Sequence, residues 1–139
     1  MTEIARMTAL PRSRVRRFWR PGAPITSIRG HCWQMGGEAQ GAAALRAAIR
    51  ERAERRVDVV KIMSSGGVTT AGTDLLACQF CDDDVRLLID EAHAAGLPVT
   101  VHAHGLPAVK QAIEAGVDGI EHCACLTPSA SAPARGSSA

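Results

Sequence analysis

The chain has 139 residues, of which 46% are hydrophobic and 22% charged. This length suffices for one domain and is too short for two, and the composition excludes a collagen, a coiled coil or a wholly disordered chain. There is no apolar stretch of about 18 residues and no secretory signal pattern, so we predict neither a membrane span nor export. Five cysteines without the spacing of a disulfide framework favour a reducing, cytoplasmic setting.

The formal net charge of +2 is unevenly distributed along the chain. Residues 1–56 contain 12 basic and 4 acidic residues, a balance of +8, whereas residues 57–139 contain 4 basic and 10 acidic residues, a balance of −6. A basic segment of this kind occurs in nucleic-acid-binding proteins, but here no aromatic residues for base stacking are interleaved with the arginines. We therefore predict a solvated charged surface and no nucleic-acid partner.

The two ends of the chain differ in composition from its middle. Residues 1–23 contain six Arg and one Glu without a sustained periodicity, which predicts an irregular leader. Residues 128–139 are rich in Ser, Ala and Pro, which predicts a disordered tail. The folded domain is therefore expected over residues 24–127.

Helices alternate with strands between these ends. Apolar residues at helical spacing predict helices around 42–53, from 82 to the stop at Gly96, and from Pro107 to Gly116. Short β-branched runs predict strands over 57–63, over 98–104 and within 117–126. This order is typical of right-handed βαβ units and a parallel sheet.

An internal repeat places histidines at matching positions of successive units. His102 and His122 each follow a glycine by six residues, and each is expected to end a strand. Lys61 lies on the preceding predicted strand, and His104 shares a strand face with His102 because side chains alternate. Polar residues that converge at the ends of parallel strands indicate a metal or catalytic site.

Four segments carry a resemblance to a known family. They are residues 30–39 (GHCWQMGGEA), 61–68 (KIMSSGGV), 102–105 (HAHG) and 120–122 (IEH). Their order and context resemble the metal-dependent amidohydrolase superfamily, most closely the branch with imidazolonepropionase-like and Xaa-Pro dipeptidase-like enzymes. The similarity runs from about residue 24 to about residue 127.

The resemblance implies a fold, an activity and a set of site residues. The expected fold is α/β, a segment of a (β/α)8 TIM-type barrel with about four βα units, and the expected activity is metal-dependent hydrolysis of C–N bonds in small amides or peptides. By resemblance, Lys61 is carboxylated by CO2 and binds one or two divalent ions, commonly zinc, together with His102 and His122. His31 and His104 are expected on the substrate side.

The sequence also departs from the family pattern. The family has an HxH motif on its first strand and a catalytic Asp after its last strand, and neither matches this sequence. Arg56 stands where the family often has Gly. We therefore expect a central barrel segment that has little activity alone and that associates with itself or with a complementary fragment. The alternative is a non-catalytic remnant that binds zinc or self-associates.

Two other metal sites remain open from the sequence. One is a mononuclear site of His102, His104 and His122. The other uses the CxxC motif of Cys78 and Cys81, with Cys123 and Cys125 downstream, as a zinc or redox site. The Gly/Ser/Thr-rich segment 64–73 lacks the Lys of a Walker loop and is expected to lie over the site.

Overall fold

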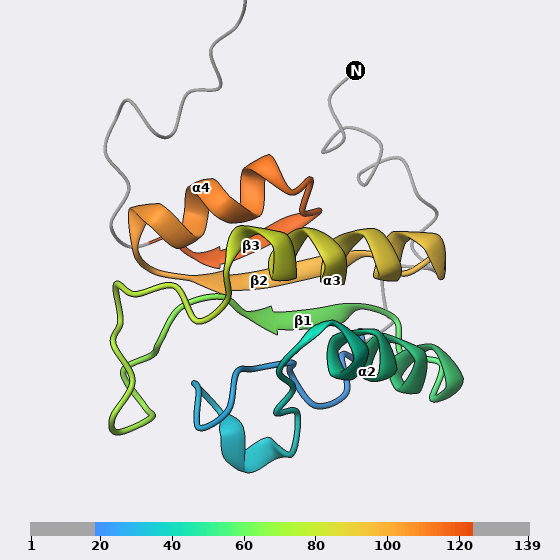
Figure 1. The fold of residues 1–139 in the computed structure, drawn as a ribbon, viewed down its shortest axis with the longest axis horizontal. Coiled ribbons are helices and arrows are strands. Elements are labelled where there is room, and N and C mark those ends of the chain that lie inside the picture. The colour runs from blue at the N-terminus through green and yellow to red at the C-terminus, as the bar shows by residue number, and fades with distance from the viewer. Residues whose placement is uncertain (1–18, 124–139) are drawn as a thin grey trace, which may run out of the picture.

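The structure is a computed structural model that describes residues 19–123. Its elements in chain order are η2 (Trp33–Met35), α2 (Ala42–Glu54), β1 (Val60–Met63), α3 (Asp82–Ala94), β2 (Val99–Ala103), α4 (Leu106–Glu114) and β3 (Gly119–His122). The three strands are parallel and form one sheet in the order β1-β2-β3, with α3 and α4 as the crossovers (Figure 1). This arrangement confirms the predicted α/β fold with parallel strands.

The first predicted strand is shorter in the structure than in the sequence pattern. β1 begins at Val60, whereas the pattern predicted a start at residue 57. The amide of Val57 donates to the carbonyl of Arg52 at 3.2 Å, and the amide of Asp58 donates to the carbonyl of Arg20 at 2.9 Å. Because these amides bond outside the sheet, the strand starts after them.

A fourth strand beside β1 is reduced to a single bridge. The amide of Ile25 donates to the carbonyl of Lys61 at 2.8 Å, and the amide of Met63 donates to the carbonyl of Ile25 at 2.9 Å. The next residue, Thr26, pairs instead with residues 37–39. The bridge at Ile25 therefore represents the strand of the predicted fourth βα unit, and α2 is the helix of that unit.

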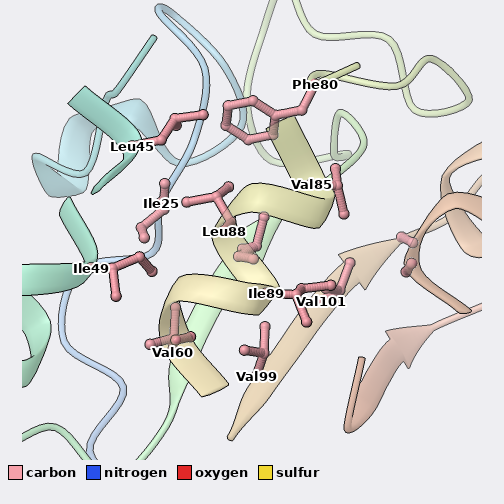
Figure 2. Close-up of a cluster of buried hydrophobic side chains, with 14 of the residues drawn as sticks. Ile25, Leu45, Ile49, Val60, Phe80, Val85, Leu88, Ile89, Val99 and Val101 are labelled. Carbon is pink, nitrogen blue, oxygen red and sulfur yellow. The ribbon is translucent and has the colours of Figure 1, made fainter. Parts of the chain in front are cut away.

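The hydrophobic core lies between the sheet and the helices. α3 and α4 pack on one face of the sheet, and α2 packs beside α3 (Figure 1). Figure 2 shows Val60, Val99 and Val101 of the strands beside Leu88 and Ile89 of α3, and all five are fully buried. Burial of one such side chain stabilises the fold by about 1.5–3 kcal/mol.

The ends of α3 follow from its sequence. Asp82, Asp83 and Asp84 occupy the first turn, where negative charge interacts favourably with the helix dipole. Gly96, just beyond the other end, has a φ of +75°, a left-handed conformation that glycine adopts without steric strain. The predicted start and stop of this helix are both confirmed.

The opposite face of the sheet, which we call the inner face, carries the polar side chains. Lys61 pairs in register with Thr100, and Thr100 pairs with Gly119. These residues, with Trp19 and Glu121, belong to the lining of a hollow of about 400 Å³. Side-chain alternation thus separates an apolar face under the helices from a polar inner face.

Parts of the predicted domain division lie outside the described residues. These parts are residues 1–18 of the predicted leader and all of the predicted tail. Within the described range, the amide of Arg20 donates to the carboxylate of Asp58 at 3.0 Å, and the carbonyl of Ala23 accepts from the buried guanidinium of Arg52.

None of the helices over residues 19–123 is long and apolar enough to cross a membrane.

Asp118, which directly precedes β3, forms hydrogen bonds to residues of α3 and β2. Its Oδ2 accepts hydrogen bonds from the amide of Val99 at 2.8 Å and from the ring of His93 at 2.7 Å. Partial burial alone would raise the pKa of Asp118, but these hydrogen bonds hold it below its usual value. The ionised carboxylate therefore stabilises the folded chain above the unfolded pKa of about 4.

We expect Asp118→Asn to lower the free energy of unfolding at pH 7 by about 1 kcal/mol. The expected loss is small because the side chains of His93 and Asp118 are both about half exposed and water screens their interaction. The difference from the parent should vanish as the pH falls through the lowered pKa of Asp118, since the parent carboxyl is then also neutral. Urea unfolding between pH 7 and pH 2.5 measures this. The exposed Asp90→Asn is the matched control, and an equal loss in both variants would contradict the role of Asp118.

Candidate metal centre

Three histidines meet at the C-terminal ends of β2 and β3. His102 is the fourth residue of β2, His104 follows that strand directly, and His122 ends β3. One ligand atom from each ring lies within 4.8 Å of the others. The ring centroids are 4.7 Å apart for His102–His104 and His102–His122, and 4.6 Å apart for the stacked His104–His122 pair. We call these three side chains the histidine cluster.

The backbone at the end of β3 brings His122 into this cluster. His102 pairs in register with Glu121, and His122 pairs with Ala103. The two histidines are therefore not at equivalent positions, although the six-residue spacing from glycine predicted that they would be. His122 has a φ of +78°, so the chain turns where strict alternation would direct its side chain to the helix face. Its ring contacts the two other rings and remains exposed.

His31 lies against the cluster from a loop before η2. Its ring centroid is 4.5 Å from that of His102, and only 6% of its surface is exposed. Nδ1 of His31 shares a hydrogen bond of 2.9 Å with Oγ1 of Thr70, and its amide donates to Oε1 of Gln79 at 2.7 Å. Gly67 permits this packing, because a Cβ at that position would meet the imidazole at 2.2 Å.

Hydrogen bonds determine which ring nitrogens of His102 and His104 are free to bind another partner. Nε2 of His102 lies 3.0 Å from the carbonyl of Gly66, and since a carbonyl only accepts, Nε2 carries the proton and Nδ1 keeps its lone pair. The amide of His104 donates to Oγ of Ser65 at 3.1 Å. Nδ1 of His104 is buried and has no hydrogen-bond partner, a condition that costs about 1–3 kcal/mol when it is left unsatisfied.

The surroundings keep the imidazoles of His31, His102 and His104 neutral. Burial lowers the pKa of His102 to about 4. The hydrogen bond to the Gly66 carbonyl opposes this shift, whereas repulsion from the three neighbouring histidines adds to it. Burial also lowers the pKa of His104, and His122 lowers it further. The pKa of His31 is lowered by burial first and then by His104, His122 and Lys61. At neutral pH His31, His102 and His104 therefore present lone pairs rather than positive charge.

A divalent metal ion fits the histidine cluster. Neutral imidazole nitrogens are good zinc ligands, and the unpaired Nδ1 of His104 is a buried donor atom that lacks any other partner. A metal-ligating histidine commonly donates its second ring N–H to a carbonyl or carboxylate, as His102 does to Gly66. The neutral rings, the tautomer of His102 and the unpaired Nδ1 of His104 are thus all consistent with a bound cation.

Lys61 lies on the inner face but has a different partner. Its Nζ forms an ion pair with the carboxylate of Glu121, and in register it stands level with Thr100, two positions before His102. The structure therefore brings together His31, His102, His104 and His122 of the predicted site residues and pairs Lys61 with a carboxylate. Glu121 was not predicted, although it directly precedes His122.

The cysteines of the CxxC motif are not among the potential ligands of the cluster. Cys78 and Cys81 are both exposed free thiols, and Cys81 directly precedes α3 as its N-cap. Burial of part of the Cys78 side chain, and then Asp82, raise the pKa of that thiol. Among the residues that the structure describes, no cysteine belongs to the group of potential ligands. Cys125 lies outside the described residues.

Segment 64–79 covers the cluster and supplies its hydrogen-bonding partners. Gly66 and Thr70 hold the rings of His102 and His31, so the expectation that residues 64–73 lie over the site is confirmed. Gln79 was not predicted because it stands inside the CxxC motif, where the flanking thiols suggested a different chemistry. Nε2 of the Gln79 side chain donates to the carbonyl of Met63 at 2.7 Å, which ties the segment to the end of β1.

Curated proteins show sequence similarity over part of this chain. The ochratoxinase of Aspergillus niger is 32% identical over 84 residues, which are 60% of this chain and 18% of that protein. An uncharacterised protein of Mycobacterium bovis is 36% identical over 104 residues, which are 75% of this chain and 26% of that protein. This chain thus spans about a fifth to a quarter of the length of these relatives.

Solved structures show the same fold over a similar share. A Xaa-Pro dipeptidase with bound methionine matches 77% of this chain and 30% of its own, with a TM-score of 0.72 and 30% identity. A prolidase complexed with N-methylphosphonate-L-proline matches 81% of this chain and 28% of its own, with a TM-score of 0.65 and 30% identity. The model of the amidohydrolase family matches residues 12–130. The three parallel strands, the histidines at their ends and this match together show that the chain belongs to the amidohydrolase family.

Proposed function

We propose that this chain forms part of the active site of a metal-dependent hydrolase that cleaves C–N bonds in small amides or peptides. The observation that carries the proposal is the convergence of three imidazoles at the ends of two successive parallel strands. In β/α barrels, catalytic groups come from these strand ends. The names of the similar structures, a Xaa-Pro dipeptidase and a prolidase, support a peptide-like substrate with an amide bond.

In this proposal His102 and His122 hold a divalent metal ion, for which zinc is well suited because both donors are imidazoles. A bound zinc ion supplies water activation and polarisation of a carbonyl group. His31 lies on the substrate side, where Thr70 fixes the orientation of its ring. Segment 64–79 contacts the ring of His102, which is 3% exposed.

Carboxylation of Lys61 is the second part of the proposal. The reaction joins the neutral amine nitrogen to the carbon of CO2 and releases one proton, which gives an anionic carbamate with two ligand oxygens. Nζ of Lys61 must first leave the carboxylate of Glu121, its partner in this structure. The carbamate would then provide the negative charge that the histidines lack.

A non-catalytic metal-binding role is the second candidate. Over residues 19–123, the group of potential ligands consists of three histidines and includes no carboxylate. A hydrolase needs a group that accepts and returns a proton, and such general acid–base catalysis contributes about 10²–10⁴-fold. The group of potential ligands among residues 19–123 offers imidazoles and no carboxylate for such a proton transfer, which supports a role in metal binding without turnover.

We expect the full chain with zinc and bicarbonate to cleave Xaa-Pro dipeptides and N-acyl amino acids only slowly, about 10²–10⁴-fold below an enzyme with a complete proton relay. The rate should disappear in His102→Ala/His122→Ala and persist in His93→Gln, a control histidine on α3. Release of free amino acid, followed by chromatography, measures the rate. Cleavage that is equal in the parent and the double variant would refute the proposal, and bound zinc without cleavage would favour the non-catalytic role.

Self-association is also part of the proposal. β3 is at the edge of the described sheet, and unpaired backbone groups at such an edge tend to pair with another chain. We expect dimers or larger species at tens of micromolar by sedimentation velocity. A monomer with cooperative thermal unfolding at that concentration would contradict this expectation.

A further inference from the structure

We infer that Cys78 and Cys81 form a dithiol that hydroperoxides oxidise to an intramolecular disulfide, and that this oxidation displaces Gln79 and, with it, His31. Both thiols are free and exposed, and the proposed function gives them no role. The inference is independent of that function, because neither a bound metal nor turnover enters it. In a reducing compartment, disulfides of this kind are transient and serve mainly in redox sensing or catalysis.

The first support is the bend of the chain between the two cysteines. The backbone bends at Gln79 and again at Phe80, so Cys78 and Cys81 lie on the two arms of the bend. Three residue steps span at most about 10 Å when the chain is extended, whereas a disulfide requires Cα atoms about 4.4–6.8 Å apart. The bend favours this approach, and closure of the disulfide then restricts the backbone at Gln79 and Phe80.

The second support is the anchoring of the residues between the thiols. The ring of Phe80 is 6% exposed, and its carbonyl accepts from Nε2 of Gln111 at 2.9 Å. The same Nε2 donates to Oδ1 of Asp82 at 2.9 Å. The backbone amide of Gln79 donates to the carbonyl of Ser64 at 2.8 Å. The backbone that carries the two thiols is therefore held in place, while the thiols themselves face solvent.

The third support is the side chain of Gln79, which connects the motif to His31. Its Oε1 accepts from the amide of His31 at 2.7 Å. Its Nε2 donates to the carbonyl of Met63 at 2.7 Å and to Oγ1 of Thr26 at 3.2 Å. Because one side chain makes all three bonds, a change in the backbone of Gln79 on disulfide closure alters the hydrogen bond that holds His31.

The two thiols differ in their surroundings. Burial of part of the side chain, and then Asp82, raise the pKa of the Cys78 thiol, so this residue carries less of the reactive thiolate at neutral pH. Cys81 is the N-cap of α3, and its Sγ makes no capping hydrogen bond. We therefore expect Cys81 to react first with the peroxide and Cys78 to complete the disulfide.

The reaction balances with a hydroperoxide as the oxidant. With hydrogen peroxide, the Cys81 sulfur attacks one oxygen, the O–O bond breaks, and the products are a sulfenic acid and water. The Cys78 sulfur then displaces the hydroxyl group as a second water and forms the S–S bond. Two thiols thus lose two electrons and two protons, and the peroxide is reduced to two waters. A dithiol such as dithiothreitol reverses the oxidation by exchange.

The test treats the reduced full chain with hydrogen peroxide, blocks the remaining thiols with N-ethylmaleimide and maps tryptic peptides by mass. Peptide 62–86 contains Cys78 and Cys81 and no other cysteine. We expect this peptide to lose two hydrogens and to take up no maleimide, and to regain both thiols after dithiothreitol. In Cys78→Ser, a dimedone probe should capture the sulfenic acid on Cys81. Cys32→Ser is the matched control and should form the disulfide as the parent does.

The connection to His31 is measured by amide NMR of the nitrogen-labelled full chain. The measurement uses Cys32→Ser, so that oxidation of the thiol next to His31 does not contribute. We expect the amide resonance of His31 to shift on oxidation and to return after dithiothreitol, while that of His93 on α3 stays in place. Adding Cys78→Ser and Cys81→Ser to this variant should abolish the shift.

Three results would overturn the inference. They are a peptide 62–86 that keeps both thiols under peroxide, a disulfide that joins Cys78 or Cys81 to a cysteine outside the motif, and a disulfide within the motif that leaves the His31 resonance unchanged. The mass measurement compares two states of the unmodified chain, so it does not depend on the folding of any variant. A chain that forms the disulfide and shifts His31 but cleaves no amide would count against the proposed function alone.

Discussion

The parallel pairing of β2 with β3 brings the histidines together. It sets His102 beside Glu121 and Ala103 beside His122, so that one carboxylate reaches Lys61 while the rings meet at the strand ends. A shift of the register by one residue would reverse the faces of these side chains. The apolar residues of the same strands oppose such a shift, because Val99 and Val101 would then leave the core beneath α3. The packing of the core thus specifies the geometry of the site.

Segment 64–79 determines the electrostatics of that site. It excludes water from His31 and His102, which are 6% and 3% exposed, and it offers them a hydroxyl and a carbonyl instead of carboxylates. Clustered imidazoles without a counter-charge resist protonation, because each positive charge would face its neighbours in a poorly solvated place. A divalent cation differs from a proton in that it engages several rings at once. The neutral rings of His31, His102 and His104 therefore keep lone pairs that a divalent cation, unlike a proton, can share.

Much of the fold could be predicted from the sequence because its signals are local. The apolar spacing of Leu88 and Ile89, and the glycine at position 96, predicted α3 and its end. Arg56 was noted as a departure from glycine, and its φ of +54° shows the physical reason, since glycine adopts that conformation at the least cost. The strand limits were predicted less well, because they depend on which partner each amide finds in the folded chain.

The candidate site was only partly predictable for a similar reason. The residue types and the strand context pointed to His102 and His122, but the turn at His122 and the one-residue offset between the strands require the folded register. The ion pair between Lys61 and Glu121 joins residues that are 60 positions apart. Gln79 was not predicted as a site residue because it stands within the CxxC motif, whose thiols suggested a different chemistry. Long-range pairing, rather than any single motif, determines these features.

The most direct measurement of the central claim is an anomalous difference map from crystals of the full chain grown with zinc and bicarbonate at neutral pH. The account predicts a peak about 2.0–2.1 Å from a ring nitrogen of His102 and from a ring nitrogen of His122. A peak between Cys78 and Cys81, or no peak beside these two histidines, would contradict it.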